Sequence, residues 1–436
     1  MGRARFVGGL LVPTIVFMFA AGADAQQGLV TPGRIGKPDA PKTMTFRVNR
    51  DHSHTQPTPA HAEGYSKLFQ AFVEKRRDWQ IRFEFFTTDI GGEHARMLEQ
   101  ARAGRAPDCA AVDSFQLALF VKQGALKPVN EFFTKAEIDD LFPFIRNGIT
   151  GPDGQIYAWW WNTDLRVLYR NKALVPNAPQ TWEELKAAAL QATKRGVDGV
   201  LFNGGRWEGT AFDWLAHFWS QGGELVDGAG KPIFGEGDNH TKMLKALTFY
   251  KDLVDSGAAP GRVTTIVTYE EFNAAALSGT TAMFMGGHWQ YFQIKAAMPP
   301  EEFAKWEVSE LPGPTRERRA TGTGGWTLGA FSRDPDKVAL CMALAREVYM
   351  GPANEVTGQL PTRQSLFDNL ATFRTPFFAE VRKYLANGKA RPGVPIYPEI
   401  SNQIQIMMGE VLSGAKDPEA ALKDAWARVM DAYQKL

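Results

Sequence analysis

Several features that assign a protein to a class are scarce or missing in this sequence. The 436 residues contain two cysteines, Cys109 and Cys341. Neither charge sign dominates, because 49 Lys and Arg face 48 Asp and Glu and leave a formal net charge of +1. Such a balance gives no support for nucleic acid or an acidic surface as a partner, since both are bound through an excess of basic side chains. Beyond the N-terminal segment, no apolar run is long enough to cross a bilayer.

Motifs of common enzyme classes are also missing. The sequence has no HExxH, no G-x-S-x-G and no G-x-x-x-x-G-K-[ST]. Ser413 and Lys416 have S-x-x-K spacing, but they lie in a Gly-containing connection between two predicted helices, so we assign them no catalytic role. We therefore expect a protein that is not an enzyme and that needs no cofactor and no metal.

Two other classes stay open at this stage. Carboxylates near tryptophans would also suit a secreted glycoside hydrolase, which needs a carboxylate pair at hydrolytic spacing. The loop with His52, His54 and His61 would suit a periplasmic metal-binding protein, although the H-x-H spacing lacks a clear fourth ligand.

The N-terminus has the pattern of a secretion signal. Arg3 and Arg5 precede an apolar stretch over 8–21, and Ala23-Asp24-Ala25 forms a small-x-small cleavage site. We expect residues 1–25 to be a cleaved signal peptide without lipid attachment, and the mature chain to begin near Gln26 in the periplasm. Residues 26–42 are rich in Gly and Pro and predict a loose leader. An oxidising compartment permits a disulfide, but spacing does not show whether the cysteines meet, and two buried free thiols is the simpler expectation.

The mature chain alternates strands and helices, which predicts an α/β fold with a mainly parallel sheet. A chain of 436 residues is too long for one compact core, so two lobes are expected. Thr181 and Glu184 form a capping-box pattern that predicts a helix to residue 194. The other predicted strands are 43–48, 80–86, 107–112, 199–202, 281–285, 306–311 and 324–331. The other predicted helices are 65–76, 93–103, 115–123, 210–221, 239–256, 269–277, 335–349, 376–386, 399–412 and 418–434.

The stretch PDGQIYAWWWNTDLRVLYRNKAL, residues 152–174, organises the rest of the chain. Two strand-like runs, 156–161 and 165–169, are separated by the polar step 162–164 beside three tryptophans. This arrangement fits a strand that crosses between two lobes, with its polar step facing a cleft. Ligands of parallel sheets sit beyond the carboxyl ends of the strands, so the loops at 51–52, 113–114 and 162–164 should converge.

The order of several motifs resembles the family-1 extracellular solute-binding proteins of bacterial ABC importers, the maltose-binding-like group. After residues 152–174, these motifs are TWEELKAAA, TAMFMGGHW, ELPGPT followed by GTGGWTLGAFSRDPDKVALCMALAREV, and GQLPTRQS. The resemblance implies a two-lobed type II periplasmic-binding-protein fold with three hinge crossings, near 162–165, 324–327 and 360–364. It implies lobe 1 over 43–163 and 327–362, and lobe 2 over 164–326 and 363–436. It also implies a monomer that closes on a sugar or sugar-like solute and delivers it to a membrane permease.

The family's cleft positions, carried onto this sequence, are Asp51, His52, His54, Asp113, Ser114, Asp164, Trp289, Gly325, Trp326 and Arg363. Sugar chemistry adds Trp160 and Trp207 as stacking surfaces, Glu208 as an acceptor for vicinal hydroxyls and Gly287 as a close backbone approach. Arg363 would donate to hydroxyls or to an anionic group. The alternatives remain structural: Asp113 as a helix cap, Glu208 as a solvated charge, Arg363 in an internal ion pair, and Gly287 in a turn. The His-rich loop and the three tryptophans are not general family features, so the solute need not be a maltodextrin.

Overall fold

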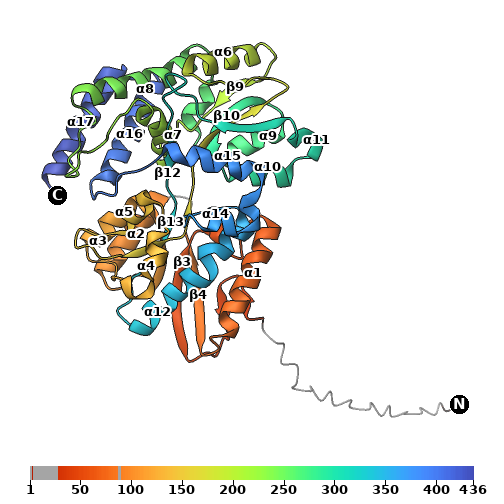
Figure 1. The fold of residues 1–436 in the computed structure, drawn as a ribbon, viewed down its shortest axis with the longest axis vertical. Helices are drawn as coiled ribbons and strands as arrows, with labels where there is room; N and C mark the ends of the chain where they lie inside the picture. The colour runs from red at the N-terminus through yellow and green to blue at the C-terminus, as the bar shows by residue number, and fades with distance from the viewer. Residues whose placement is uncertain (1, 3–27, 87–89) are drawn as a thin grey trace.

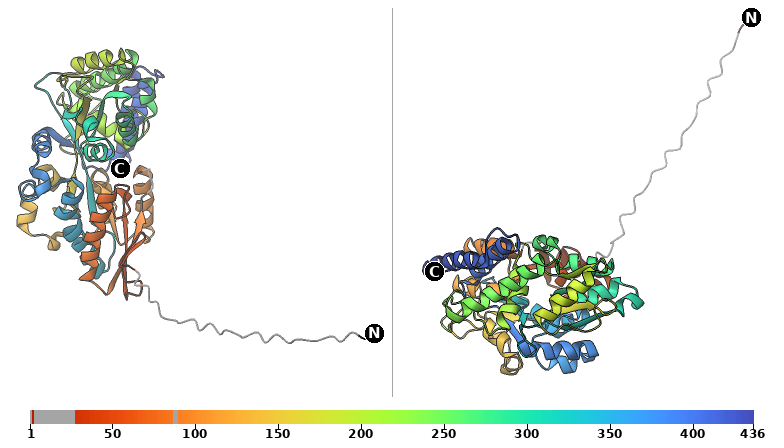
Figure 2. Two further views of the ribbon diagram at one scale, coloured as in Figure 1. Left: turned by 90° about the vertical axis from the view of Figure 1, so that its right-hand side faces the viewer. Right: turned by 90° about the horizontal axis from the view of Figure 1, so that it is seen from above.

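The computed structural model describes residues 2, 28–86 and 90–436, and these residues form two lobes, one above the other in Figure 1. The predicted signal peptide lies outside the described residues, except for residue 2. Within the described part, no helix is long and apolar enough to cross a membrane. The side view in Figure 2 shows the two lobes separated by a waist that strands cross.

Lobe 1, the lower lobe in Figure 1, is built on a seven-stranded sheet of order β1-β2-β4-β3-β5-β13-β6. Its strands are β1 (Val30–Thr31), β2 (Arg34–Gly36), β3 (Lys42–Val48), β4 (Trp79–Phe85), β5 (Cys109–Asp113), β6 (Ala158–Trp160) and β13 (Trp326–Ala330). Its helices are α1 (Pro59–Glu74), α2 (Ile90–Arg102), α3 (Leu117–Lys122), α4 (Lys135–Asp139), α5 (Pro143–Ile149) and α12 (Pro335–Leu344). The alternation of strands and helices confirms the α/β prediction. β3 is parallel to β4 and to β5, but the other four strand pairs are antiparallel, so the expectation of a mainly parallel sheet is wrong for lobe 1.

The expected loose leader is ordered from residue 28 onward. β1 and β2 form a hairpin, and β2 pairs antiparallel with β4. Ile35 is fully buried under this hairpin. Gly36 adopts φ +90°, and a Cβ there would lie 2.2 Å from the carbonyl oxygen of Trp79. The two strands are too short to give a periodic pattern, which is why the sequence suggested a leader.

Lobe 2 contains a four-stranded sheet of order β11-β8-β10-β9. Its strands are β8 (Arg166–Asn171), β9 (Asp198–Leu201), β10 (Thr281–Gly287) and β11 (Trp306–Glu310). Only β9 and β10 are parallel, so the expectation of a mainly parallel sheet is wrong for this lobe. Its helices are α6 (Trp182–Thr193), α7 (Glu208–Trp219), α8 (Gly237–Asp255), α9 (Glu270–Leu277), α10 (Gln290–Ala297), α11 (Pro300–Phe303), α15 (Pro376–Tyr384), α16 (Tyr397–Leu412) and α17 (Pro418–Gln434).

Three crossings join the lobes, as the fold class predicts. The first runs from β6 through β7 (Asn162–Thr163) to β8, and the second from β12 (Thr321–Thr323) to β13. The third contains β14 (Leu360–Pro361), which pairs with β7. Gly325 adopts φ +137°, and a Cβ there would lie 2.0 Å from the Asn162 carbonyl oxygen. Glycine is therefore required where the second crossing passes the first.

Each lobe has its own hydrophobic core, and Phe115 of lobe 1 packs into the core of lobe 2 against Tyr397. Trp159 and Trp161 are among the largest fully buried side chains of lobe 1. Cys109 and Cys341 form a disulfide that links β5 to α12, so the expectation of free thiols is wrong. The helix predicted over 335–349 continues past α12 as a π-helical segment, η5 (Ala345–Ala353), which is kinked at Met350 and Gly351. Short helices complete the chain: α13 (Asn354–Thr357), α14 (Leu366–Asn369), η1 (Arg50–His52), η2 (Ser114–Gln116), η3 (Asn130–Phe132), η4 (Gly261–Thr265), η6 (Ala371–Arg374) and η7 (Leu385–Asn387).

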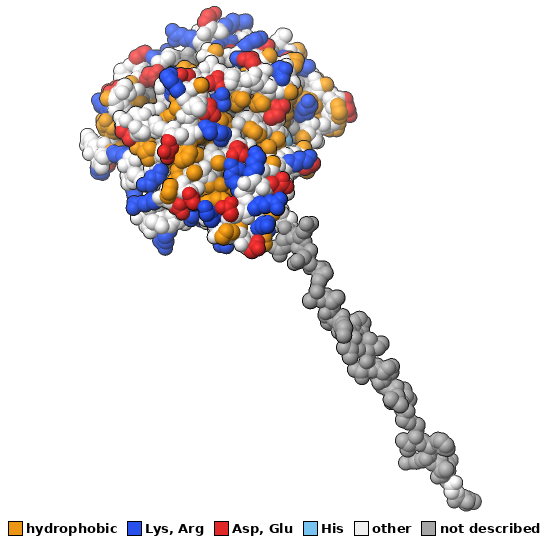
Figure 3. All heavy atoms as spheres, turned by 60° about the horizontal axis from the view of Figure 1, so that its bottom comes forward, with side chains coloured by type: hydrophobic (Ala, Val, Ile, Leu, Met, Phe, Trp, Pro, Cys, Tyr) orange, Lys and Arg blue, Asp and Glu red, His pale blue; other side chains and the backbone are white. Residues whose placement is uncertain are grey.

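The face shown in Figure 3 carries basic and acidic side chains side by side around scattered hydrophobic ones. Neither sign forms a continuous field on this face, in keeping with the formal net charge of +1.

Candidate functional site: the cleft between the lobes

The loops that follow β3 and β5 meet the start of β13 at one edge of the lobe 1 sheet. The Ser114 backbone N–H donates to the Gly325 carbonyl at 3.0 Å. Asp113 is the register partner of Trp326, and the His52 ring lies 5.5 Å from the Trp326 ring. The structure thus brings together Asp113, Ser114, Gly325, Trp326 and His52, as expected from the rule that ligand loops follow the carboxyl ends of strands.

Trp326 is enclosed by other rings. It is 9% exposed, and its ring centroid lies 5.5 Å from Phe86 and 6.2 Å from a nearly parallel His94. Its backbone N–H donates to Asn162 Oδ1 at 2.8 Å, which fixes the second crossing against the first. Burial lowers the pKa of the adjacent His52 to about 3, so this imidazole is neutral at physiological pH. Most of the Trp326 surface is therefore packing surface.

Three aromatic rings from three separate segments of lobe 2 lie close together. Tyr269 lies between Trp207, at 5.1 Å, and Trp289, at 5.0 Å, and both tryptophans meet it edge-on. Trp207 and Trp289 are half-buried, so each keeps some accessible ring surface. Sequence reasoning found both tryptophans but missed Tyr269, which it predicted only as the first residue of the helix over 269–277.

Arg166 is buried next to this aromatic group. Its Nε pairs with Asp213, and its Nη1 lies 3.2 Å from Asp164 Oδ1. The Tyr269 hydroxyl donates to the same Asp213 at 2.8 Å. The guanidinium is buried over the Phe212 ring at 4.0 Å and lies 5.0 Å from Trp289. Burial opposes its charge, but the nearby acidic groups outweigh burial and raise the pKa of Arg166, so it stays charged.

The Asp164 side chain joins two of the segments that cross between the lobes. Its Oδ1 accepts the Gly324 backbone N–H at 3.0 Å, which ties the first crossing to the second. Burial raises the pKa of the Asp164 carboxyl, and the Arg166 charge opposes that rise. Sequence reasoning missed Arg166. Its position as a charged residue inside the apolar run 165–169 was the signal that it needs a buried acidic partner.

Arg391, also missed, links the two expected carboxylates. Its Nη2 donates to Asp113 Oδ1 at 2.7 Å, and its Nη1 donates to Glu208 Oε1 at 2.9 Å. Glu208 also accepts the Tyr397 hydroxyl at 3.0 Å and the Ser401 hydroxyl. Asp113 and Glu208 are therefore engaged by the protein itself, in contrast to the solvated charge considered for Glu208.

The sequence profile of the bacterial extracellular solute-binding proteins matches residues 58–348, more than half of the chain. The chain belongs to this family.

Relatives of this solute-binding protein agree in length and fold. A binding protein of Brucella abortus (strain 2308) is 25% identical over 371 residues, covering 82% of this chain and 84% of its own. An ABC transporter solute-binding protein of Thermotoga lettingae, solved with alpha-D-tagatose, is 26% identical with a TM-score of 0.75, covering 89% of this chain and 99% of its own. Maltose-bound MalE3 of T. maritima is 25% identical with a TM-score of 0.76, covering 89% and 98%. These neighbours confirm the type II fold.

Several predicted site residues of the solute-binding protein are used for structure. His54 Nε2 bonds to the Thr31 carbonyl at 2.7 Å, and its ring packs edge-on against Phe69 and Phe83 inside lobe 1. Arg363 Nε donates to Asp140 Oδ2 at 2.8 Å, the internal ion pair considered as its alternative. The structure does not bring either residue to the loops at 113–114 and 325–326.

Trp160 and Gly287 also have local roles. Trp160 is 2% exposed and its two neighbours in the run are buried even more fully, so it offers no open ring face. It packs against Phe144. The Gly287 carbonyl accepts the Tyr169 hydroxyl at 2.8 Å, and its N–H donates to Gln290 Oε1 at 2.9 Å. Gly287 thereby shapes the turn that presents Trp289.

Asp51 differs from the other carboxylates because its side chain is exposed in η1. Partial enclosure raises the pKa of the Asp51 carboxyl, and the negative charge of Glu270 raises it further. Since Glu270 begins α9 in lobe 2, the two carboxylates approach each other from opposite lobes.

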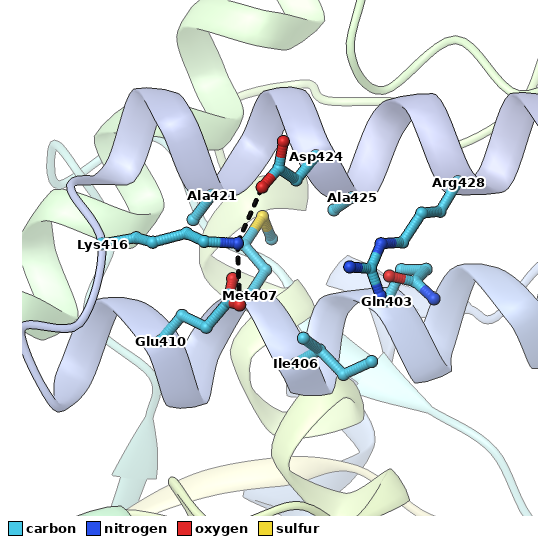
Figure 4. A pocket seen from close by; sticks show the side chains of 9 residues that line it. All are labelled: Gln403, Ile406, Met407, Glu410, Lys416, Ala421, Asp424, Ala425 and Arg428. Carbon is cyan, nitrogen blue, oxygen red and sulfur yellow. Dashed lines mark hydrogen bonds and ion pairs between the residues drawn. The ribbon is translucent and has the colours of Figure 1, made fainter.

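The structure also bears on the metal-binding alternative and on the S-x-x-K pair. Among residues 28–86 and 90–436, no three His, Cys, Asp or Glu side chains are arranged to hold a metal ion. The S-x-x-K pair has local structural partners: Ser413 Oγ donates to the Gly409 carbonyl at 2.7 Å. Figure 4 shows the Lys416 amino group between Glu410 and Asp424, at 2.8 and 2.7 Å, where it joins α16 to α17.

Proposed function

We propose that this protein is the substrate-binding component of an ABC importer, which binds a sugar or sugar-like solute between its lobes and presents the closed form to a membrane permease. The observation that carries this proposal is the group Trp207, Tyr269 and Trp289 on lobe 2. The neighbouring residues Glu208 and Glu270 face lobe 1, Glu208 through Arg391 and Glu270 through the charge of Asp51. A pyranose has an apolar C–H face that packs on such rings and a rim of hydroxyls that needs polar partners. The tagatose and maltose found in the two structural neighbours support the same ligand class.

The charge pattern favours a neutral solute over an anionic one. Arg166, Arg391 and Arg363 each donate to a carboxylate of the protein. No anion clamp is therefore left among these three, and an anionic group would have to displace a paired carboxylate. Asp51 and Glu270 add negative charge at the cleft, which opposes an anion further.

We propose that the protein is a binding protein without hydrolytic activity. Burial raises the pKa of Glu208, a property shared with the general acids of glycosidases. However, its carboxylate already accepts bonds from Arg391, Tyr397 and Ser401. These bonds occupy most of the acceptor positions of a carboxylate and hold it away from a proton-transfer role.

We further propose a periplasmic monomer released by signal cleavage near Gln26. The test is a thermal-shift screen of this mature form against neutral sugars, polyols, sugar phosphates, sugar acids and zinc, because ligand that binds only the folded state raises Tm. A shift with one neutral sugar class is expected. A shift with sugar acids or zinc alone would overturn the proposal, and released monosaccharide from a bound oligosaccharide would overturn the absence of hydrolysis.

A further inference from the structure

Arg391 reaches across the cleft from the connection between β15 (Gly388–Ala390) and α16. Its two ion-pair partners come from different lobes. Asp113 ends β5 of lobe 1, whereas Glu208 begins α7 of lobe 2. The side chain of Arg391 is 3% exposed, and those of Asp113 and Glu208 are 11% and 12% exposed. The bridge is therefore largely removed from water.

The flat faces of the guanidinium are covered in the same manner. Its central carbon lies 4.4 Å from the ring centroid of Phe115, in η2 of lobe 1, and 3.9 Å from that of Phe212, in α7 of lobe 2. Each lobe thus supplies one carboxylate and one aromatic ring to a single cation. Burial opposes the charge, but Asp113 and Glu208 outweigh it and raise the pKa of Arg391.

We propose that Arg391 is an interlobe tie that holds the lobes closed without solute, so that the ligand-free protein populates the closed form. When the lobes separate, Arg391 can keep only one of its two carboxylates, because Asp113 and Glu208 move apart. The other half of a buried, hydrogen-bonded charge pair is broken, and such bonds are among the stronger ones in proteins. This inference deepens the proposed function, since it describes how the same cleft closes, but its test requires no sugar.

The tie has a consequence for binding. Solute normally drives closure through its contacts with both lobes, and it can shift the equilibrium only by its differential affinity for the two forms. If the closed form is already populated, entry of solute requires spontaneous opening, which slows association. Removal of the tie is expected to speed association and to make closure depend on solute.

The experiment is small-angle X-ray scattering of the ligand-free mature protein in four forms: wild type, Arg391→Met, Asp113→Asn and Arg170→Met. Arg170 is the matched control, because it is a buried arginine whose carboxylate partner, Glu307, lies in the adjacent strand of the same lobe. We expect wild type and Arg170→Met to give the scattering profile calculated from the structure described above, in which Arg391 contacts both lobes. Arg391→Met and Asp113→Asn should have a larger radius of gyration, with the ratio of closed to open molecules reduced at least about tenfold.

Chemical rescue tests the cation itself. Millimolar methylguanidinium added to Arg391→Ala should restore the smaller radius of gyration and leave wild type unchanged. If Arg391→Met or Arg391→Ala fails to fold, as judged by circular dichroism, Asp113→Asn alone decides the question, because it keeps the side-chain shape. Ligand-free wild type that scatters as an open form, or an Asp113→Asn variant as compact as wild type, would overturn the tie. Failure to bind any sugar would overturn the proposed function and leave these scattering results unaffected.

Discussion

Trp289 meets Tyr269 edge-on, with 5.0 Å between the ring centroids and 88° between the ring planes. Tyr269 is itself fixed by the hydrogen bond from its hydroxyl to Asp213. The indole of Trp289 is therefore held in one orientation while it remains half-buried. A ring that is both fixed and partly accessible suits the face of a sugar, because little side-chain entropy is lost on binding.

Trp289→Ala should weaken sugar binding by about 2 kcal/mol, roughly thirtyfold in Kd, as expected for an aromatic anchor. Isothermal titration calorimetry with the sugar identified in the screen measures this change. Trp426→Ala is the matched control, because Trp426 is a half-buried lobe 2 tryptophan that packs on Phe234 from α17. Equal affinities of Trp289→Ala and Trp426→Ala would remove Trp289 from the site.

Trp326→Ala should reduce stability as well as affinity. From sequence alone we would expect a binding defect in an intact fold, but the structure buries this ring against His52, Phe86 and His94. Truncation of a buried tryptophan costs about 3–5 kcal/mol. Urea unfolding measures the loss, and Trp326→Phe should recover part of it. A Trp326→Ala variant with the stability of wild type would contradict the packing role.

Acid should destabilise the protein through His217, in the core of lobe 2. Burial lowers the pKa of His217 from 6.5 to about 3, so the unfolded chain takes up a proton at a higher pH than the folded chain. Stability is therefore complete above pH 6.5 and falls as the pH drops toward 3, by about 1.4 kcal/mol per unit.

The measurement is the free energy of unfolding at pH 7.5 and at pH 5. His217→Gln should remove about 2 kcal/mol of the wild-type loss between these values. His240→Gln serves as control, because His240 is partly accessible and pairs with Glu419. If His217→Gln and wild type lose the same free energy, His217 is not one of the acid-sensitive groups.

Replacement of both Cys109 and Cys341 by alanine should lower the free energy of unfolding by about 2–5 kcal/mol. The disulfide closes a loop with a sequence separation of 232 residues, and long loops gain the most from closure in the chain-entropy account. Chemical denaturation with and without reductant should show the same difference in wild type. Titration of two free thiols in the unreduced, unfolded protein would show that the bond does not form.

Local signals were predictable from sequence, and long-range pairings were not. Thr181 caps α6 through its Oγ1, which accepts the Glu184 N–H at 3.2 Å, because the cap depends only on neighbouring residues. Arg391 and Asp113 are 278 residues apart in the chain, and nothing near either residue indicates the other. Long-range ion pairs of this kind determine which carboxylates are already bound by the protein. The charge available to a ligand could therefore not be predicted from the sequence.

The accessibility of the three tryptophans at 159–161 could not be predicted from the sequence either. Residue type and position beside a polar step suggested that one of the three rings reaches the cleft, yet all three are at most 2% exposed. Trp289 was predicted from the family resemblance and Trp207 from the aromatic surface that a sugar needs, and the structure places each at the start of a helix. Composition identified the residues that suit sugar binding, and only packing separated accessible rings from buried ones.

The place of β13 between β5 and β6 determines the order in which the exported chain can fold. β6 joins the lobe 1 sheet only through β13, which lies more than 150 residues later in the sequence. The four strands of the lobe 2 sheet, from β8 to β11, all precede β13 in the chain. The sheet of the second lobe can therefore be assembled while β5 and β6 of the first still have unpaired edges, which are sites for aggregation. The N-terminal lobe is begun first and completed last.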